Sequence, residues 1–220
     1  MQQLAKGAPM TATARTRNGA SGAPADEPGS SAQRDRRKRI LDATLALASK
    51  GGYEAVQMRA VAERADVALG TLYRYFPSKI HLLVSALARE LERVYDKTPV
   101  PPGDTPTERL TFMIGRITKA LQRDPQLTEA MTRAFMFADA SAAAEVDTVG
   151  KLMDLTFARA MSESENPTEE QLAIARVISD VWLANLVAWV TRRASANDVA
   201  SRLELTISLL MGQRSGSDAF

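Results

Sequence analysis

The stretch MRAVAERADVALGTLYRYFPSK, residues 58–79, decides how this chain folds. The spacing of its apolar residues predicts two very short helices, roughly Met58–Ala65 and Leu69–Tyr75, joined by residues 66–68. Two such helices with a three-residue turn between them form a helix-turn-helix, whose second helix can lie in a DNA major groove. Pro77 then breaks the chain, and Ser78 suits the N-cap of a following long helix. The stretch therefore predicts a DNA-binding module.

The distribution of charge supports this prediction. Residues 33–79 carry ten Lys and Arg against five Asp and Glu, whereas residues 80–220 carry fifteen against nineteen. A basic segment on an otherwise acidic chain is typical of a nucleic-acid module attached to another domain. A solvated basic face gives the same count, so charge alone leaves both interpretations open.

Helical periodicity continues on both sides of this stretch, without the alternation typical of strands. We predict an all-α protein of about nine helices, with a DNA-binding domain of three helices at residues 33–79 and a helical bundle for ligand binding and dimerisation at residues 80–220. Residues 1–32, rich in Ala, Gly, Ser, Thr and Pro, predict a disordered arm. The other helices are expected at residues 33–50, from 78 onward, and at 107–123, 125–137, 141–161, 167–193 and from 195 onward.

Composition argues against several classes of function. The 220 residues include no cysteine and one histidine, His81, which argues against disulfides, thiolate metal sites and a Ser-His-Asp triad. No uninterrupted apolar run reaches the roughly 18–20 residues of a membrane span, and the N-terminus lacks the apolar core of a secretion signal. We expect a cytoplasmic protein with no catalytic site, metal, cofactor or membrane partner, and we expect His81 at the surface or in a cap.

The string from Met58 to Lys79, with the basic helix before it, resembles the DNA-binding signature of TetR-family transcriptional repressors. The resemblance implies that Gly70 lets the recognition helix approach the DNA backbone closely, while Thr71 and Tyr73 reach base edges or phosphates. Arg74 and Lys79 would supply charge to phosphates. The full set of expected DNA contacts is Arg37, Arg59, Leu69, Gly70, Thr71, Tyr73, Arg74, Tyr75 and Lys79.

The stretch also departs from the family pattern. Asp66 stands where the family usually has a turn glycine, and Asp tolerates the left-handed backbone region that such a turn needs. Ala68 and Gln57 stand where Ser or Thr caps are common, so both short helices should lack a side-chain cap at a cost of about 0.5–2 kcal/mol each. Leu72 and Phe76 are expected to anchor the recognition helix to the first helix.

Longer stretches resemble one branch of the TetR family, the repressors of cholesterol catabolism. They include RRKRILDAT at residues 36–44, LTEAMTRAF at 127–135 and ARVISDVWL at 175–183, and the similarity extends over about residues 33–211. The resemblance implies a homodimer on double-stranded operator DNA that represses steroid-degradation genes. It also implies a small-molecule effector, a steroid acyl-CoA thioester of the 3-oxo cholestenoyl type, that releases the DNA.

The helical bundle carries bulky, adaptable apolar side chains on three successive helices. Methionine fills irregular spaces and tolerates repacking, so such a cluster suits a pocket for a large apolar ligand. A packed core is the alternative, and without the family resemblance it is the favoured one. The residues expected to bind the ligand are Phe112, Met113, Arg116, Met131, Phe135, Met153, Phe157, Trp182, Asn185, Leu186 and Trp189.

The helix at residues 167–193 is apolar almost all round, so it should face the pocket on one side and a partner subunit on the other. Asn185 lies on one face with Trp182 and Trp189, where its amide either bonds a ligand oxygen or is satisfied inside the fold. The final helix would complete the dimer interface, with Leu203 facing outward. Phosphates of a CoA thioester need positive charge at the pocket mouth. The candidates are Arg116, Lys119, Arg123 and Arg133.

Three other functions remain open from the residues alone. A fatty acyl-CoA or another hydrophobic molecule can replace the steroid as effector, because a Met and Phe pocket does not specify a steroid. A constitutive DNA-binding repressor would have a filled core instead of a pocket. A helical enzyme acting on acyl-CoA would need a base, for which only carboxylates such as Asp139, Glu145 and Asp147 are at hand.

Overall fold

The computed structural model describes residues 31–97, 101–162 and 166–212. Within these ranges the protein is all-α, as predicted. The elements are α1 (Ser31–Ala55), α2 (Met58–Ala65), α3 (Leu69–Tyr75), α4 (Lys79–Lys97), α5 (Pro106–Arg123), α6 (Pro125–Met136), the 3-10 turn η1 (Ala140–Ala142), α7 (Ala143–Met161), α8 (Glu169–Val190) and α9 (Ala196–Gly212). The predicted disordered arm lies outside the described residues, except for Ser31 and Ala32, which begin α1.

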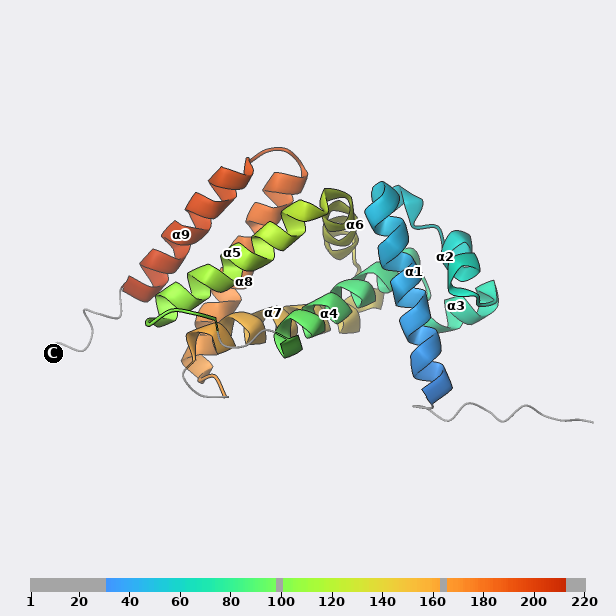
Figure 1. The fold of residues 1–220 in the computed structure, drawn as a ribbon, viewed down its shortest axis with the longest axis horizontal. Helices are drawn as coiled ribbons and strands as arrows, with labels where there is room; N and C mark the ends of the chain where they lie inside the picture. Colours follow the sequence, from blue (N-terminus) through green and yellow to red (C-terminus); the bar gives the residue numbers. More distant parts are fainter. Residues whose placement is uncertain (1–30, 98–100, 163–165, 213–220) are drawn as a thin grey trace, which may run out of the picture.

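The helices form two groups along an elongated molecule. Helices α1, α2 and α3 lie together at one end, whereas α5, α8 and α9 lie at the other (Figure 1). Helix α4 runs from the first group into the second and packs against α1, α6 and α7. Helix α6 also packs against α1. The DNA-binding end is therefore held by two helices of the bundle, although the boundary at residue 79 itself stays a prediction.

Two glycines end the regular part of α1. Gly51 (φ −154°, ψ 26°) and Gly52 (φ 65°, ψ −159°) interrupt the helix after residue 50, where the sequence predicts its end. A positive φ is accessible to glycine without steric cost, so the chain can change direction here and continue toward α2. The interruption places Tyr53 against α6, where its backbone N–H donates to Glu129 Oε2 at 3.1 Å.

The turn between α2 and α3 follows the prediction. Asp66 adopts the left-handed conformation (φ 52°, ψ 56°), and its N–H bonds to carbonyls of α2. Neither Gln57 nor Ala68 provides a side-chain cap, which confirms the expected absence of caps on both helices. Leu72 and Phe76 are buried in the hydrophobic core, and the Phe76 ring lies beside Arg37 of α1. Hydrophobic packing therefore holds a recognition helix that lacks a capping bond.

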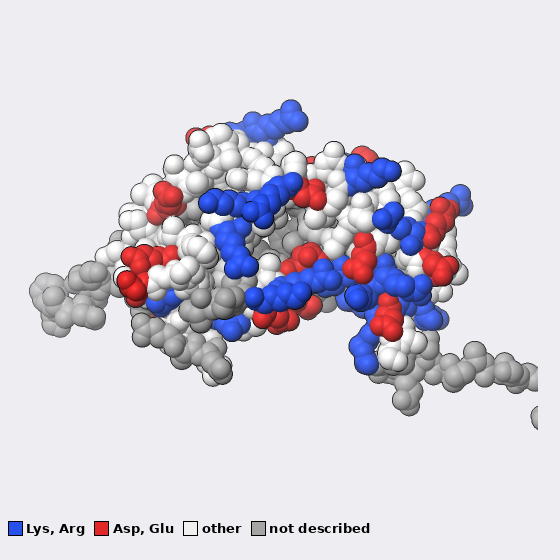
Figure 2. Space-filling model, in the orientation of Figure 1, with Lys and Arg blue, Asp and Glu red and all other residues white. Residues whose placement is uncertain are grey.

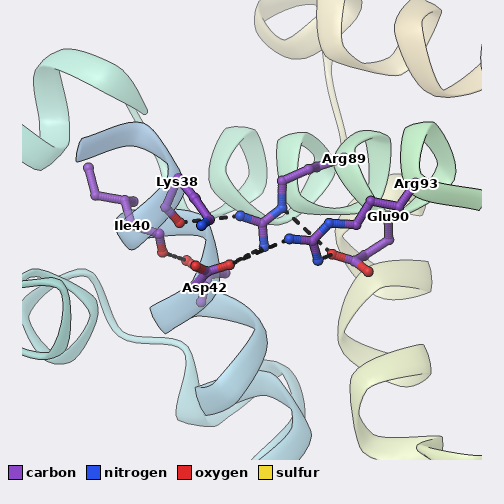
Figure 3. A network of polar contacts seen from close by, with 7 residues as sticks. Lys38, Ile40, Asp42, Arg89, Glu90 and Arg93 are labelled. Atoms are coloured by element: carbon purple, nitrogen blue, oxygen red, sulfur yellow. Dashed lines mark hydrogen bonds and ion pairs between the residues drawn. The ribbon is translucent and has the colours of Figure 1, made fainter. Parts of the chain in front are cut away.

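An ion-pair network joins α4 to α1 (Figure 3). Arg89 lies 2.9 Å from the Asp42 carboxylate and donates to the Lys38 carbonyl at 3.2 Å. Glu90 pairs with Arg93 at 2.7 Å on the same face of α4. The Arg89 side chain is only 11% exposed, so solvent screens its attraction to Asp42 less than it would screen a surface pair.

His81 makes a second connection at the start of α4. It is buried, so of the two expected places, the surface or a cap, the structure excludes the surface and agrees with the cap. Nδ1 lies 2.9 Å from Ser78 Oγ, and Nε2 donates to the Ser141 carbonyl in η1 at 3.0 Å. Because a carbonyl oxygen can only accept, Nε2 carries a proton in this arrangement. The histidine thus ties the first turn of α4 to the segment before α7.

The ends of α8 and α9 are fixed by short polar motifs. Thr168 and Gln171 form a capping box, so α8 begins at Glu169 and not at the predicted residue 167. Ser195 caps α9 as predicted, because Ser195 Oγ accepts from the Asp198 N–H while Asp198 accepts from Ser195. The hydrogen bonds from Ser195 also lower the pKa of Asp198.

Helix α8 is long and apolar enough to cross a membrane by length and composition alone. It packs instead against α6, α7 and α9, with Ala175, Ile178 and Trp182 in the core. The expectation that Leu203 faces outward is wrong, because that side chain is 2% exposed within the protomer. The outward apolar positions of α8 and α9 are Val177, Leu205 and Leu209.

Candidate DNA-binding surface and effector cavity

The surface predicted to contact DNA is built on α3 and the helices beside it. Tyr73, Arg74 and Gly70 are exposed on the recognition helix, while Leu69, Thr71 and Tyr75 are half-buried. Arg59 on α2 and Arg37 on α1 are also exposed. Lys and Arg side chains gather over the part of the molecule around α1, with acidic side chains among them (Figure 2). The arrangement leaves a polar and basic face free to meet a charged partner.

Two side chains of α1 support the end of α3. The Arg36 guanidinium donates to the Tyr75 hydroxyl at 3.5 Å, and the Arg37 guanidinium lies 5.6 Å from the centre of the Phe76 ring. Arg37 combines this cation–π contact with an exposed position, so its charge is directed along the face that α3 presents. The basic first helix therefore both positions the recognition helix and adds charge beside it.

Gly70 is not required by packing inside the protein. A methyl group built on it meets no atom within 4 Å, and it does not have the positive φ that favours glycine. Glycine weakens a helix by roughly 0.5–1 kcal/mol relative to alanine. The protein therefore carries a destabilising residue on its exposed recognition helix without an internal reason.

The Lys79 side chain, which was expected to bind a DNA phosphate, packs against another side chain of the protein. Its Nζ atom is 3.7 Å from the centre of the Tyr53 ring, and the guanidinium of Arg133 lies 4.4 Å from that centre. Burial lowers the pKa of Lys79, and the charge of Glu54 acts in the opposite direction. Arg133 in turn pairs with Glu54 at 3.0 Å and with Glu129 at 3.7 Å. This Tyr53 cluster joins α1, α4 and α6.

A cavity of about 400 Å³ opens among the helices of the bundle. Leu87 and Leu91 of α4 form part of its wall, and Gly150 of α7 borders it. This volume lies within the roughly 300–1,000 Å³ usual for small-molecule sites. The complete lining is Leu87, Leu91, Leu121, Thr128, Met131, Thr132, Phe135, Asp147, Val149, Gly150, Lys151, Met153, Asp154, Arg176, Ser179, Asp180, Trp182, Leu183 and Leu186.

The cavity brings together five of the residues predicted to bind a ligand. These are Met131, Phe135, Met153, Trp182 and Leu186. Trp182 meets Phe157 edge-on behind the wall, with ring centres 6.4 Å apart, and its Nε1 donates to Thr118 Oγ1 at 3.4 Å. The other predicted residues do not border this cavity: Phe112, Met113, Arg116, Phe157, Asn185 and Trp189.

Asn185 is satisfied inside the fold. Its Nδ2 donates to the Val181 carbonyl at 2.8 Å, and its Oδ1 accepts from Arg202 at 3.5 Å. Of the two interpretations of this buried amide, the structure agrees with the one that gives it protein partners. Trp189 lies farther along α8, beside the smaller hollow that it shares with Thr118.

The charged groups beside the cavity differ from the predicted ones. None of Arg116, Lys119, Arg123 and Arg133 borders it. The basic residues that border the cavity are Lys151 and Arg176, and the acidic ones are Asp147, Asp154 and Asp180. Arg176 Nε lies 3.4 Å from Asp154 Oδ2 across α7 and α8. Sequence reasoning named Asp147 only as a possible catalytic base and missed the other four residues, although their recurrence every three or four positions on two helices marks one polar stripe.

The carboxylates considered for catalysis form no catalytic arrangement. Asp139 Oδ1 accepts hydrogen bonds from the backbone and hydroxyl of Ser141, and these bonds lower its pKa. A carboxyl group held ionised as a cap is poorly suited to act as a general base near neutral pH. Glu145 lies in the first turn of α7, where an acidic side chain favours the helix dipole. In the described part of the chain, no group of acidic and histidine side chains is placed to hold a metal ion.

Comparison with known families identifies both parts of the chain. Residues 40–86 match the family described as bacterial regulatory proteins, tetR family. Residues 103–210 match the tetracyclin repressor-like C-terminal domain. The first segment begins within α1 and ends within α4, and the second spans α5 to α9, which supply most of the cavity lining.

Curated relatives span nearly the whole chain. A protein named HTH-type transcriptional repressor KstR from Rhodococcus jostii is 70% identical over 209 residues, which cover 94% of this chain and 98% of the relative. Its namesakes from Mycolicibacterium smegmatis and Mycobacterium tuberculosis are 73% and 68% identical, covering 84% and 86% of this chain and 92% and 86% of the relatives.

Solved structures share the same fold. A TetR transcriptional regulator from Rhodococcus sp. RHA1 is 34% identical, with a TM-score of 0.74 over 81% of this chain and 96% of the other. The FadR repressor of Thermus thermophilus, solved in complex with lauroyl-CoA, has a TM-score of 0.52 at 19% identity over 80% of this chain and 93% of the other. The second likeness concerns the fold alone.

Proposed function

Because this chain belongs to the TetR family of bacterial regulatory proteins, we propose that it represses steroid-catabolism genes and leaves its operator when a steroid acyl-CoA thioester fills the cavity. The chain is a TetR-type transcriptional repressor and not an enzyme. The proposal adds the regulated process, the effector and the release mechanism. Acting on genomic DNA, the protein would work in the cytoplasm.

The relatives support the regulated process. Three curated proteins at 68–73% identity carry the name KstR, and the sequence stretches that resemble repressors of cholesterol catabolism lie in both the DNA-binding module and the bundle. An apolar cavity lined by Met131, Met153 and Trp182 suits a large, rigid hydrocarbon ring system. Lys151 and Arg176 beside it offer positive charge to the phosphates of a CoA group.

One observation carries the release mechanism: α4 is both a wall of the cavity and a support of the DNA-binding module. Leu87 and Leu91 border the cavity, while Arg89, between them in sequence, holds Asp42 of α1 at 2.9 Å (Figure 3). A ligand that pushes Leu87 and Leu91 aside would act on the helix that also carries Arg89. The position of α1, and with it that of α3, would then change.

Release would operate by a population shift. A ligand with higher affinity for one arrangement of α4 increases the population of that arrangement. In a homodimer, two recognition helices must meet successive major grooves about 34 Å apart, so a small rotation of each module is sufficient to lose the operator. The exposed Val177, Leu205 and Leu209 on α8 and α9 provide the apolar face on which such a dimer would form.

A fatty acyl-CoA is the alternative effector. The cavity lining is apolar and rich in methionine, which accommodates a flexible chain as well as a ring system. The two candidates differ in shape, because a rigid steroid nucleus needs a wide cavity and a fatty acyl chain a narrow one. Competition between a steroid thioester and a fatty acyl thioester for the purified protein distinguishes them.

The proposal is tested by a binding titration on promoter DNA from a steroid-degradation cluster, at fixed salt, with and without a steroid acyl-CoA. We expect sequence-selective binding that the thioester weakens by at least tenfold, and little response to a fatty acyl-CoA of equal concentration. Operator affinity that is unchanged at saturating thioester would refute the proposed effector. Failure to select this promoter over unrelated DNA would refute the proposed target genes.

A further inference from the structure

Ser179 is a buried hydroxyl group without a protein partner. The residue is 8% exposed on α8 and borders the cavity, and its Oγ makes no hydrogen bond within the described part of the chain. Thr128 borders the same cavity, but its Oγ1 donates to the Leu121 carbonyl at 2.8 Å. A buried polar group left without a hydrogen bond is destabilising, and such groups are rare in native proteins.

Ser179 lies between the charged and the apolar parts of the cavity wall. Arg176 and Asp180, three residues before it and one after, are exposed and belong to the polar stripe with Asp154 and Lys151. Trp182, three residues further along, is buried and belongs to the apolar wall. Ser179 therefore lies where the charged border of the cavity meets its apolar interior. Its Oγ is shielded in the empty protein, so the side chain must rotate about its Cα–Cβ bond to turn the hydroxyl toward a ligand.

We propose that Ser179 Oγ donates a hydrogen bond to the thioester carbonyl oxygen of the effector, an inference that rests on the proposed function. The steroid nucleus would occupy the apolar interior, because its hydrocarbon rings gain by leaving water. The phosphates of CoA must remain at the charged border near Lys151 and Arg176. The thioester carbonyl joins these two parts and would therefore lie beside Ser179. Its oxygen can accept a hydrogen bond from the Ser179 hydroxyl.

This hydrogen bond would let the protein distinguish acyl-CoA thioesters from sterols without a carbonyl at that place. A site built to bond a polar group discriminates against analogues that lack it, because its own polar group then stays unpaired. Ser179 would thus be a specificity residue for the thioester. The unpaired hydroxyl would destabilise the empty protein, and the hydrogen bond to the ligand would remove this destabilisation.

The experiment compares two ligands and three proteins by calorimetric titration. The ligands are a 3-oxo steroid acyl-CoA thioester and its thioether analogue, in which CH2 replaces the carbonyl. The proteins are the wild type, Ser179→Ala and Ser85→Ala, the last removing a buried hydroxyl of α4 that does not border the cavity. This design is a double-mutant cycle between one side chain and one ligand atom.

We expect the wild type and Ser85→Ala to prefer the thioester over the thioether by about five- to tenfold. Ser179→Ala should bind both ligands with the weaker, thioether-like affinity. Its melting temperature without ligand should rise, because the change removes an unpaired buried hydroxyl. A purely structural role for Ser179 would lower the melting temperature instead.

Three results would overturn the inference. Equal thioester affinity in the wild type and Ser179→Ala would show that the hydroxyl does not contact the ligand. A loss in Ser179→Ala that persists with the thioether would assign the hydroxyl to another ligand atom. A wild-type protein that binds neither ligand would refute the proposed effector and, with it, this contact, whereas the first two results leave the effector intact.

Discussion

At the scale of single residues, Gly70 is a glycine that the fold does not require. Space around its Cα is open and its backbone conformation suits any residue, so nothing inside the protein selects glycine. The remaining physical reason is an external surface that approaches the helix closely. Because the chain is a TetR-type repressor, we propose that this surface is the DNA backbone.

Gly70→Ala should therefore change stability and DNA affinity in opposite directions. We expect the free energy of unfolding to rise by up to about 0.5 kcal/mol, because alanine is the better helix former but Gly70 lies in the first turn of α3 and not in its interior. Operator affinity should fall at least severalfold, because the added methyl group would meet DNA. Gly115→Ala on α5, where a methyl group is equally free of contacts, is the control that should gain stability and keep its affinity. Thermal melting and operator titration check both, and undiminished operator affinity in Gly70→Ala would contradict the assignment.

Arg74 is exposed on α3 and is expected to contact a phosphate. Arg74→Ala should weaken binding to all DNA sequences alike and reduce the slope of log affinity against log salt by about 2, because each subunit of the proposed dimer loses one neutralised phosphate. Titrations at several salt concentrations measure the slope. Arg116→Ala, which removes an exposed charge from α5, should leave the slope unchanged. An unaltered slope in Arg74→Ala would show that this side chain does not bind a phosphate.

At the scale of elements, α4 connects the cavity with the DNA-binding module. Its Arg89 binds Asp42 of α1, its Lys79 covers Tyr53, and its His81 contacts the segment before α7. We assign these contacts to the arrangement that binds DNA. Because the operator and the effector would bind different arrangements, a change that loosens these contacts should lower the affinity for DNA and raise the affinity for the effector.

Asp42→Asn removes the carboxylate that Arg89 approaches while keeping the size of the side chain. We expect operator affinity without ligand to fall about two- to fivefold, in keeping with the removal of one partly screened ion pair, and effector affinity to rise by a factor set by the populations of the two arrangements. Titrations of the variant with operator DNA and with effector measure the two affinities. A fall in operator affinity with no gain for the effector would mean that the network supports α1 without coupling it to the cavity.

The sequence predicted the elements well because their signals are local. Glycine at positions 51 and 52, proline at 77 and the residues 66–68 mark helix ends through backbone conformation, which depends on few neighbours. The cavity was harder to predict, because apolar residues at helical spacing face either a packed core or a ligand, and only the packing of separate helices decides between them. Phe157 lies in the core and Met153 at the cavity wall, although they are one turn apart on α7.

At the scale of the whole molecule, the proposed mechanism requires a dimer. Leu205 and Leu209 are 60% and 58% exposed on α9, one turn apart, whereas Leu203 is buried in the protomer. Leu205→Glu should therefore give folded monomers with unchanged helical content, because a charge buried in an apolar interface is costly. Leu203→Glu should instead unfold the bundle. Light scattering and circular dichroism distinguish these results, and a dimeric Leu205→Glu protein would place the interface elsewhere.

The central claim is that filling the cavity releases the operator, and Gly150 offers the most direct test. This glycine of α7 borders the cavity, and a methyl group built on it meets no atom within 4 Å. A large side chain at this position would take up space that the effector needs without displacing protein atoms near the backbone. Gly150→Ala is the matched control, because it makes the same change of backbone entropy with little added volume.

The measurement is an operator titration of the wild type, Gly150→Ala and Gly150→Phe at fixed salt, each with and without steroid acyl-CoA. The proposed mechanism predicts that all three proteins bind the operator without ligand. The thioester should release the wild type and Gly150→Ala, while Gly150→Phe remains bound at thioester concentrations that free the other two. Release of Gly150→Phe at the same thioester concentration as the wild type would contradict the claim that the effector acts through this cavity.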